Sequence, residues 1–173
     1  MFGLEKGKLG FSEYDTQWPA RFEQERTRIR EALGKHCGQV WHMGSTAVPG
    51  LMAKPVIDIA MDYADANQLW HIVEGMEYTL GYQFKNCHHE ANHWYLKYEE
   101  DRKHLFHVHL WLGGSQGLLD HLKFVDNLRN NPALRDEYAQ KKHEWAEVSE
   151  WDKMKYSECK GDFVKKVLAW KQG

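Results

Sequence analysis

The sequence predicts an α+β protein with a mixed β-sheet, flanking helices and a C-terminal helical layer. Short apolar or alternating runs, which indicate strands, occupy the middle of the chain and are accompanied by one helical segment. From about residue 116 onward, apolar residues recur at helical spacing instead. Separation of strands and helices along a chain is typical of α+β layer packing.

The chain length supports one domain. A chain of 173 residues can enclose one core and is short for two. We therefore expect a single domain over residues 1–173, with an α/β core over about 14–115 and C-terminal helices over about 116–173.

Composition narrows the class of protein. The formal net charge of −2 creates no basic field, which argues against nucleic acid as a partner. Cysteines 37, 87 and 159 are odd in number and widely spaced, which argues against a disulfide framework or a zinc knuckle. The segment "MFGLEKGKLG" lacks a signal-peptide core, and no apolar run approaches the ~20 residues that span a bilayer. We expect a cytoplasmic protein without a membrane partner.

The first helix is expected within residues 14–34. Pro19 suits a first helical turn, and Gly34 stands where a left-handed C-cap would lie. The apolar residues that fall near one face are Phe22, Ile29 and Leu33. A short apolar strand over 39–43 then runs into Gly44.

The next strand is predicted over residues 56–62, after a loop over 44–55 that two prolines and a glycine keep irregular. The strand is rich in β-branched residues, and its alternation places Asp58, Ala60 and Asp62 on one side. Asp65 is the expected N-cap of a helix over about 66–76.

Three further strands are predicted over 81–84, 93–98 and 104–112. In the last of them, alternation separates two faces: Leu105, His107, His109 and Trp111 on one, and Phe106, Val108 and Leu110 on the other. Helices follow over about 117–129, from Pro132 with Asn131 as its cap, and over about 153–171 with an interruption at Gly161.

The Gly44–Ser45 pair suggests a phosphate site. A Gly-Ser turn after a strand frees backbone N–H groups for a phosphate, and Ser45 adds a hydroxyl. Asp58 on the neighbouring strand can hold Mg²⁺ together with phosphate oxygens. The alternative is purely structural: the glycine permits a tight turn, and Asp58 bonds a backbone amide.

Three segments carry recognisable motifs: "YDTQWPARFEQERTRIREALG", "WHMGSTAVPGLMAKPVIDI", and "HVHLW" with "LKFVDNLRNNPALRDEYAQKK". They resemble the signatures of the GrpB family, the UPF0157 group, and the resemblance covers about residues 14–170. The resemblance implies the nucleotidyltransferase superfold, whose hallmark is a Gly-Ser turn followed by an acid-x-acid strand. The family's activity is mostly unassigned, and its domain also occurs fused to dephospho-CoA kinase.

The chain departs from that hallmark. Ala60 stands where the second carboxylate belongs, and Asp62 is expected roughly 13 Å from Asp58 along the strand, too far for one metal site. The histidine-bearing strand offers His107 and His109 but no third acid. With Asp58, and with His42 as a further candidate ligand, these histidines would form a 2-His-1-carboxylate or His-rich site suited to Zn²⁺, Mn²⁺, Fe²⁺ or Ni²⁺. The alternative is that one histidine is a core residue and the other bonds backbone or substrate.

Basic and aromatic residues complete the expected site. Lys54 precedes the acid-bearing strand, and the resemblance places Arg129, Lys142 and Lys160 at basic positions of the family pattern, where they would bind an anionic substrate. Val125 replaces an arginine that the family usually carries. Four aromatic residues are either core or able to stack a base: Trp94, Tyr95, Trp111 and Tyr156.

The leading hypothesis is a metal-assisted transferase that acts on a nucleotide or another phosphorylated small molecule, including a CoA-related one. The expected cofactor is Mg²⁺ or Mn²⁺, or Zn²⁺ if the histidine pair ligates. Two alternatives stay open: a non-catalytic phosphate-binding module, for which Ala60 and Val125 argue, and a metal enzyme of another class with a His-rich site. The aromatic content would also allow a homodimer face.

Overall fold

The computed structural model describes residues 2–171, without the side chain of Lys153. Its strands are β1 (Leu4–Glu5), β2 (Val40–Met43), β3 (Ile57–Tyr63), β4 (Gln83–His88), β5 (His93–Glu100) and β6 (Lys103–Leu112). Its α-helices are α1 (Trp18–Leu33), α2 (Ala66–Glu74), α3 (Gln116–Asn130), α4 (Pro132–Val148), α5 (Lys153–Glu158) and α6 (Gly161–Ala169). Short helical turns include η2 (Ser45–Ala47) and the π-helical η3 (Gly75–Thr79).

The strands form one mixed sheet in the order β2-β3-β6-β5-β4, with β1 added beside β6. The pair β3–β6 is parallel, and the other pairs are antiparallel. The parallel register aligns Asp58 with His107 and Ala60 with His109. Side chains at paired positions lie on the same face of a sheet, so this register decides which polar groups meet.

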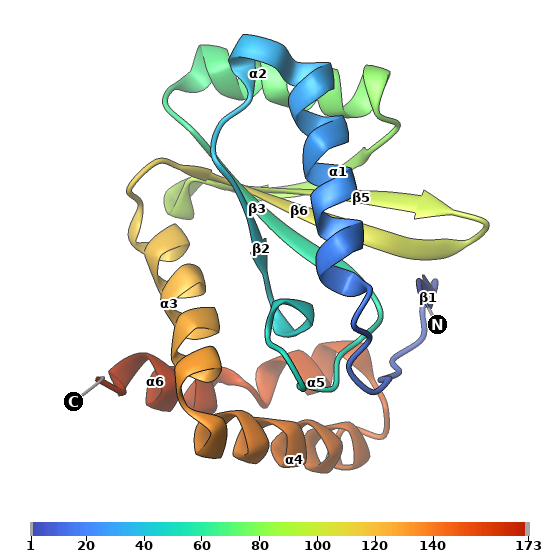
Figure 1. Ribbon diagram of the computed structural model, residues 1–173, viewed down its shortest axis with the longest axis vertical. Helices are drawn as coiled ribbons and strands as arrows, with labels where there is room; N and C mark the ends of the chain where they lie inside the picture. The colour runs from blue at the N-terminus through green and yellow to red at the C-terminus, as the bar shows by residue number, and fades with distance from the viewer. Residues whose placement is uncertain (1, 172–173) are drawn as a thin grey trace.

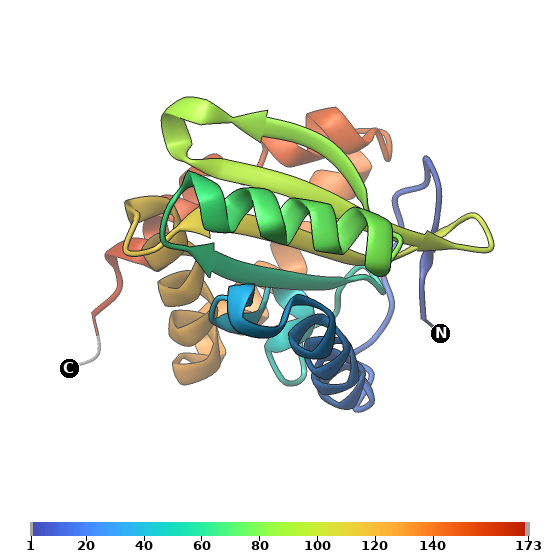
Figure 2. The same ribbon diagram turned by 90° about the horizontal axis from the view of Figure 1, so that it is seen from above.

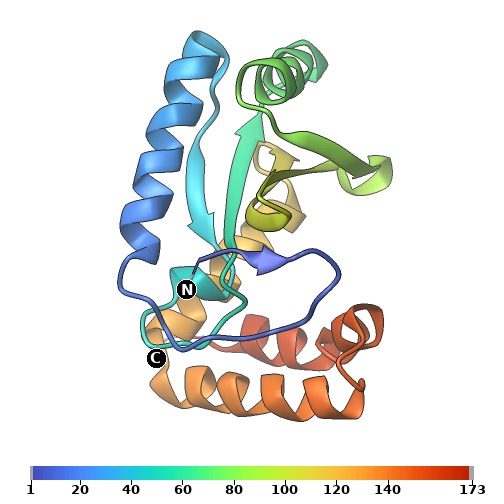
Figure 3. The same cartoon turned by 90° about the vertical axis from the view of Figure 1, so that its right-hand side faces the viewer.

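Helices cover both faces of the sheet (Figures 1 and 2). One face packs on α1 and α2, and its core includes Ile57, Ile59, Met61, Val108 and Leu110. The other face packs on the C-terminal helices, and its core includes Met43, Ala60, Trp111, Leu128 and Val167. In Figure 3, α4 and the helices after it gather below the strands, away from α2. The β3 side chains therefore alternate between two different helical layers.

The predicted α+β class and mixed sheet are confirmed, and most elements lie within a few residues of their expected bounds. The caps of α2 and α4 are also confirmed, since Asp65 accepts a hydrogen bond from Gln68 N and Asn131 from Leu134 N. The expected interruption at Gly161 is confirmed too, since the last helical segment consists of two helices, α5 and α6, divided before Gly161.

One detail differs from the expectation, and one turn has an unusual backbone. Strand β1 was not predicted, because two residues carry no periodic signal. The β5–β6 hairpin turns through Asp101 and Arg102, both with positive φ (49° and 63°), although neither is glycine. Such a turn needs left-handed backbone at both central residues, for which aspartate is better suited than arginine.

No helix within residues 2–171 combines the length and the apolar character needed to cross a bilayer.

Candidate functional site

The turn after β2 packs directly on the acid of β3. Gly44 has φ +69°, and a Cβ atom there would overlap Asp58 Oδ2. The register that pairs Met43 with Asp58 brings the two segments this close. Glycine is therefore required at position 44 for two reasons, its backbone conformation and the space that Asp58 occupies. Ser45 follows and begins the short turn η2.

Asp58 is held by His107. Their side chains are neighbours across the parallel pair, and His107 Nδ1 lies 3.1 Å from Asp58 Oδ1. Asp58 is 30% exposed and His107 17% exposed, so water reaches the carboxylate better than the imidazole. Burial raises the pKa of the Asp58 carboxyl, but the hydrogen bond and charge of His107, together with the electrostatic effects of His109 and Lys160, leave that pKa below its ordinary value. Asp58 is therefore an anion at neutral pH.

Lys142 reaches this turn from α4. Its Nζ donates to Ser45 Oγ at 2.6 Å and to the carbonyl of Met52 at 2.7 Å. The residue is only 2% exposed. Among residues 2–171, no carboxylate forms an ion pair with it. Burial, followed by repulsion from Lys160, holds the pKa of the Lys142 amine well below its ordinary value.

Lys160 lies at the junction of α5 and α6, beside Asp58. Burial lowers the pKa of its amine to about 8, and the Asp58 carboxylate opposes that shift. The amines of Lys160 and Lys54 lie 4.3 Å and 4.8 Å from the ring centre of the buried Tyr156. Tyr156 thus serves as a common support for two cationic groups.

Two cavities lie beside these groups. The smaller, of about 70 Å³, is lined by Phe11, Ser45, Thr46, Ala53, Lys54, Asp58, Lys142, Tyr156 and Lys160; we call it the lysine niche. The larger, of about 440 Å³, lies between the sheet and the C-terminal helices, and its wall includes Gly44, His109, Asp120, His121, Phe124, Tyr138 and Val164. Ser45, Asp58 and Lys160 line both, so the two cavities are neighbours. The site therefore consists of a small cationic niche next to a roomier, partly apolar cavity.

His109 lines the larger cavity but pairs with His93 of β5. His109 Nδ1 lies 2.8 Å from His93 Nε2, and the rings are stacked with centres 5.1 Å apart. Burial lowers the pKa of His109 to about 3 and that of His93 to about 4, so both are neutral at pH 7. Within residues 2–171, no three His, Cys, Asp or Glu side chains converge to hold a metal ion. The expected grouping of Asp58, His107 and His109 around one metal is not what the geometry presents.

His42 lies on the other face of the sheet, which corrects its expected place beside Asp58. It pairs with Ile59, its ring stacks on Phe22 at 4.8 Å, and its Nε2 lies 3.0 Å from Thr46 Oγ1. Burial lowers the pKa of His42 to about 4, so it is neutral at pH 7. It connects β2 to the turn η2.

Arg129 supports the turn from outside the cavities, which corrects its expected role as a phosphate contact. Its Nε donates to the carbonyl of Ala47 at 2.9 Å, and the side chain lines a separate groove next to α1. Val125, at the position of the family's arginine, is buried in the cavity wall. The cationic contacts of the site therefore come from lysines.

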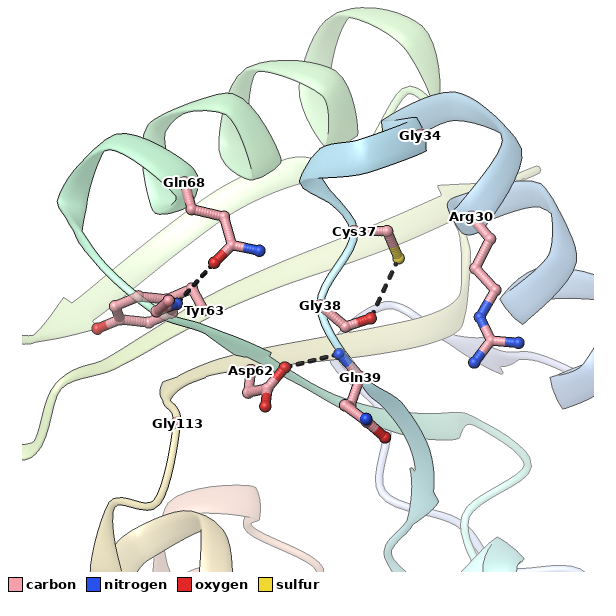
Figure 4. Close-up of a pocket in the computed structure, with 10 residues that line it drawn as sticks. Arg30, Gly34, Cys37, Gly38, Gln39, Asp62, Tyr63, Gln68 and Gly113 are labelled. Carbon is pink, nitrogen blue, oxygen red and sulfur yellow. Dashed lines mark hydrogen bonds between the residues drawn. The ribbon is translucent and has the colours of Figure 1, made fainter.

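Asp62 lies in a recess separate from the two cavities around Asp58. Its Oδ1 accepts a hydrogen bond from Gln39 N at 2.6 Å, in a recess of about 830 Å³ shown in Figure 4. Arg30, Cys37 and Gln68 also line that recess. Although it is larger, it lacks the buried amines that mark the lysine niche, and we assign the candidate site to the niche and its neighbouring cavity.

Two polar residues that α3 contributes to the site were not anticipated from the sequence. Asp120 and His121 on α3 line the larger cavity, and Asp120 accepts a hydrogen bond from Gln116. Their position on a helix with many polar residues carries no signal that separates them from a solvated face. Two of the aromatic residues predicted to stack a base or to belong to the core lie in different places. Tyr156 lines the niche, whereas Trp111 packs in the core.

Gly44→Ala is expected to destabilise the fold more than Gly114→Ala. Both glycines have positive φ (69° and 74°), but only at Gly44 would the new methyl group overlap another residue, Asp58. The left-handed backbone alone costs roughly 1–2 kcal/mol for a residue with Cβ. Urea denaturation should give that loss for Gly114→Ala and a clearly larger one for Gly44→Ala. Equal losses would show that the turn does not pack on Asp58.

Asp58→Asn is expected to lower the pKa of Lys160 below about 8. The carboxylate favours the charged amine, so its removal leaves burial unopposed. NMR titration of the lysine Cε signals measures this pKa, and Asp62→Asn, on the same strand, is the matched control that should leave it unchanged. An unchanged or higher pKa in Asp58→Asn would contradict the placement of Lys160 beside Asp58.

Comparisons with known proteins agree with this architecture. A sequence model of the GrpB protein family matches residues 8–169. A UPF0157 protein of Halalkalibacterium halodurans is 35% identical over 164 residues, which are 90% of this chain and 78% of that relative. The UPF0157 protein YqkA of Bacillus subtilis is 28% identical, and the match spans only 50% of its length.

Solved structures support the same assignment. The crystal structure of GrpB from Enterococcus faecalis matches with a TM-score of 0.80 and 30% identity, over 92% of this chain and 94% of that one. The Cid1 poly(U) polymerase, in a structure with MgGTP bound, matches with a TM-score of 0.51 and 14% identity, over 81% of this chain and 44% of that one. The second likeness shows the nucleotidyltransferase-like fold alone. On the extent of the family match and the shared fold, the chain belongs to the GrpB family.

Proposed function

We propose that this chain binds the phosphate group of a nucleotide or another phosphorylated small molecule. The phosphate would lie in the lysine niche at Ser45, and the rest of the ligand would lie in the larger cavity. The observation that carries the proposal is the buried Lys142 amine, which bonds Ser45 and Met52 without a carboxylate among residues 2–171.

Charge supports this assignment. A buried ammonium that forms no ion pair is costly, and an anion placed beside it would offset that cost. Lys54 and Lys160 line the same niche, whose wall holds one carboxylate, Asp58. The local charge therefore favours an anionic ligand even though the whole chain is slightly acidic.

The larger cavity suits the organic part of such a ligand. Its volume of about 440 Å³ lies within the range of about 300–1,000 Å³ that is usual for small-molecule sites. Phe124, Tyr138 and Val164 give it apolar and aromatic surface, while His109 and Asp120 give it polar groups. A nucleoside, with a flat base and a polar sugar, has this mixed character.

Metal assistance, which the superfold implies, does not fit these residues well. A two-metal mechanism needs two metal ions about 4 Å apart, held by several bridging acids. Here Ala60 replaces the second acid of β3, and Asp58 is already engaged by His107. Asp120 lines the cavity but joins no group of three metal-binding side chains within residues 2–171. We therefore assign no step of the function to a metal ion.

Group transfer is the second candidate, and the Asp58–His107 pair favours it. Asp58 lines both cavities and would touch the ligand, whereas His107 lines neither and would orient the carboxylate. Turnover of a bound nucleotide, lost in Asp58→Asn and kept in Asp62→Asn, would distinguish transfer from binding alone.

Nucleotides are expected to raise the melting temperature of the wild-type protein. A ligand at 100 times its Kd stabilises by about 2.7 kcal/mol, and roughly 2–4 °C accompany each kcal/mol in a domain of this size. Ser45→Ala should weaken binding about threefold to tenfold, because one hydrogen bond contributes roughly 0.5–1.5 kcal/mol. Thermal shift with nucleoside mono-, di- and triphosphates and CoA precursors measures both effects.

Thr27→Ala is the matched control for that experiment. It removes a hydroxyl that bonds Glu23 on the exposed face of α1, far in sequence from the niche. Equal effects of Ser45→Ala and Thr27→Ala, or no shift with any phosphorylated compound, would contradict the proposed function.

A further inference from the structure

We infer that the lysine niche neutralises the ligand's phosphate by itself, so that the chain binds phosphate without a divalent metal ion. This inference rests on the proposed function and goes beyond it, because it assigns the charge compensation to Lys54, Lys142 and Lys160. It also departs from the superfold, in which acidic residues and metal ions hold the phosphates.

The residues that line the niche and its volume favour a single phosphoryl group. Three amines and a single carboxylate line a space of about 70 Å³, which is too small for a nucleoside and suits one phosphoryl group. Amine–phosphate contacts are charge-assisted hydrogen bonds, which are about twice as strong as neutral ones. Ser45 Oγ, held by Lys142, adds a hydroxyl at the same place.

The three lysine amines are held close to the niche before any ligand binds. Lys142 is anchored by two hydrogen bonds of 2.6 and 2.7 Å, and Lys54 and Lys160 lie against the same Tyr156 ring. Like charges held this close repel one another, and an anion between them relieves the repulsion. The niche is therefore preorganised for a phosphate, which reduces the conformational entropy that is lost on binding.

A Mg²⁺ ion is disfavoured beside Asp58. A Mg²⁺ ion at Asp58 would have to displace the hydrogen bond from His107 at 3.1 Å or use the remaining oxygen alone. It would also lie among the amines that share its sign of charge, and that repulsion is strong where water is scarce. Ala60 offers no second carboxylate to offset this cost.

Isothermal titration calorimetry with inorganic pyrophosphate tests the inference. The Kd in EDTA is expected to agree with the Kd in excess Mg²⁺ to within about threefold, which is less than 1 kcal/mol. Lys160→Met should weaken binding in EDTA roughly tenfold to a hundredfold, because it removes one charge-assisted contact. Lys165→Met is the matched control on α6, since Lys165 is 80% exposed and pairs with Asp162, and it should bind like the wild type.

The outcomes are distinguishable. Binding that EDTA abolishes and Mg²⁺ restores would overturn this inference and leave the proposed function standing. Equal binding by Lys160→Met and Lys165→Met would also overturn it. No binding under either condition would contradict the proposed function itself. Lys142→Met removes a more deeply buried amine, so Lys160→Met is the primary variant, and circular dichroism of each variant confirms that it is folded.

Discussion

The parallel pairing of β3 with β6 is the constraint on which the rest of the site depends. This register places Asp58 beside His107 and Ala60 beside His109, and side-chain alternation turns all four toward the C-terminal helices. A shift of one residue would turn Asp58 into the apolar core under α1 and α2. The burial of Ile57, Ile59 and Met61 in that core therefore holds the acid in position on the opposite face.

The C-terminal helices then decide what surrounds the acid. Helix α4 contributes Lys142 and the α5–α6 junction contributes Lys160, so two of the three amines come from a layer separate from the sheet, while Lys54 comes from the loop before β3. In a metal-dependent site of this fold, we would expect further carboxylates on the strands, where this chain has Ala60, His107 and His109. Without those acids, a single carboxylate remains among three lysines in the niche.

Several of these features could be predicted from local sequence, and others could not. The Gly-Ser turn and the strand alternation of Asp58, His107 and His109 follow from short patterns, and the structure confirms that these strands adjoin. The pairing of His109 with His93 depends on the hairpin register, which shifts between Tyr98 and Glu99 and cannot be read from local alternation. The family pattern assigned Lys142 to the site, but its almost complete burial could not be predicted, because lysine is rarely buried. His42 was assigned to the site by proximity in sequence and Arg129 by the family pattern, but strand pairing turns His42 to the other face and Arg129 supports the turn from outside.

The most direct measurement is an NMR titration of lysine side-chain signals with inorganic pyrophosphate in EDTA. The account predicts that the Cε signals of Lys54, Lys142 and Lys160 move most, while those of Lys165 and Lys166 on the outer part of α6 do not. It would be contradicted if those three signals stayed still, or if backbone amides moved instead around the recess of Gln39 and Asp62.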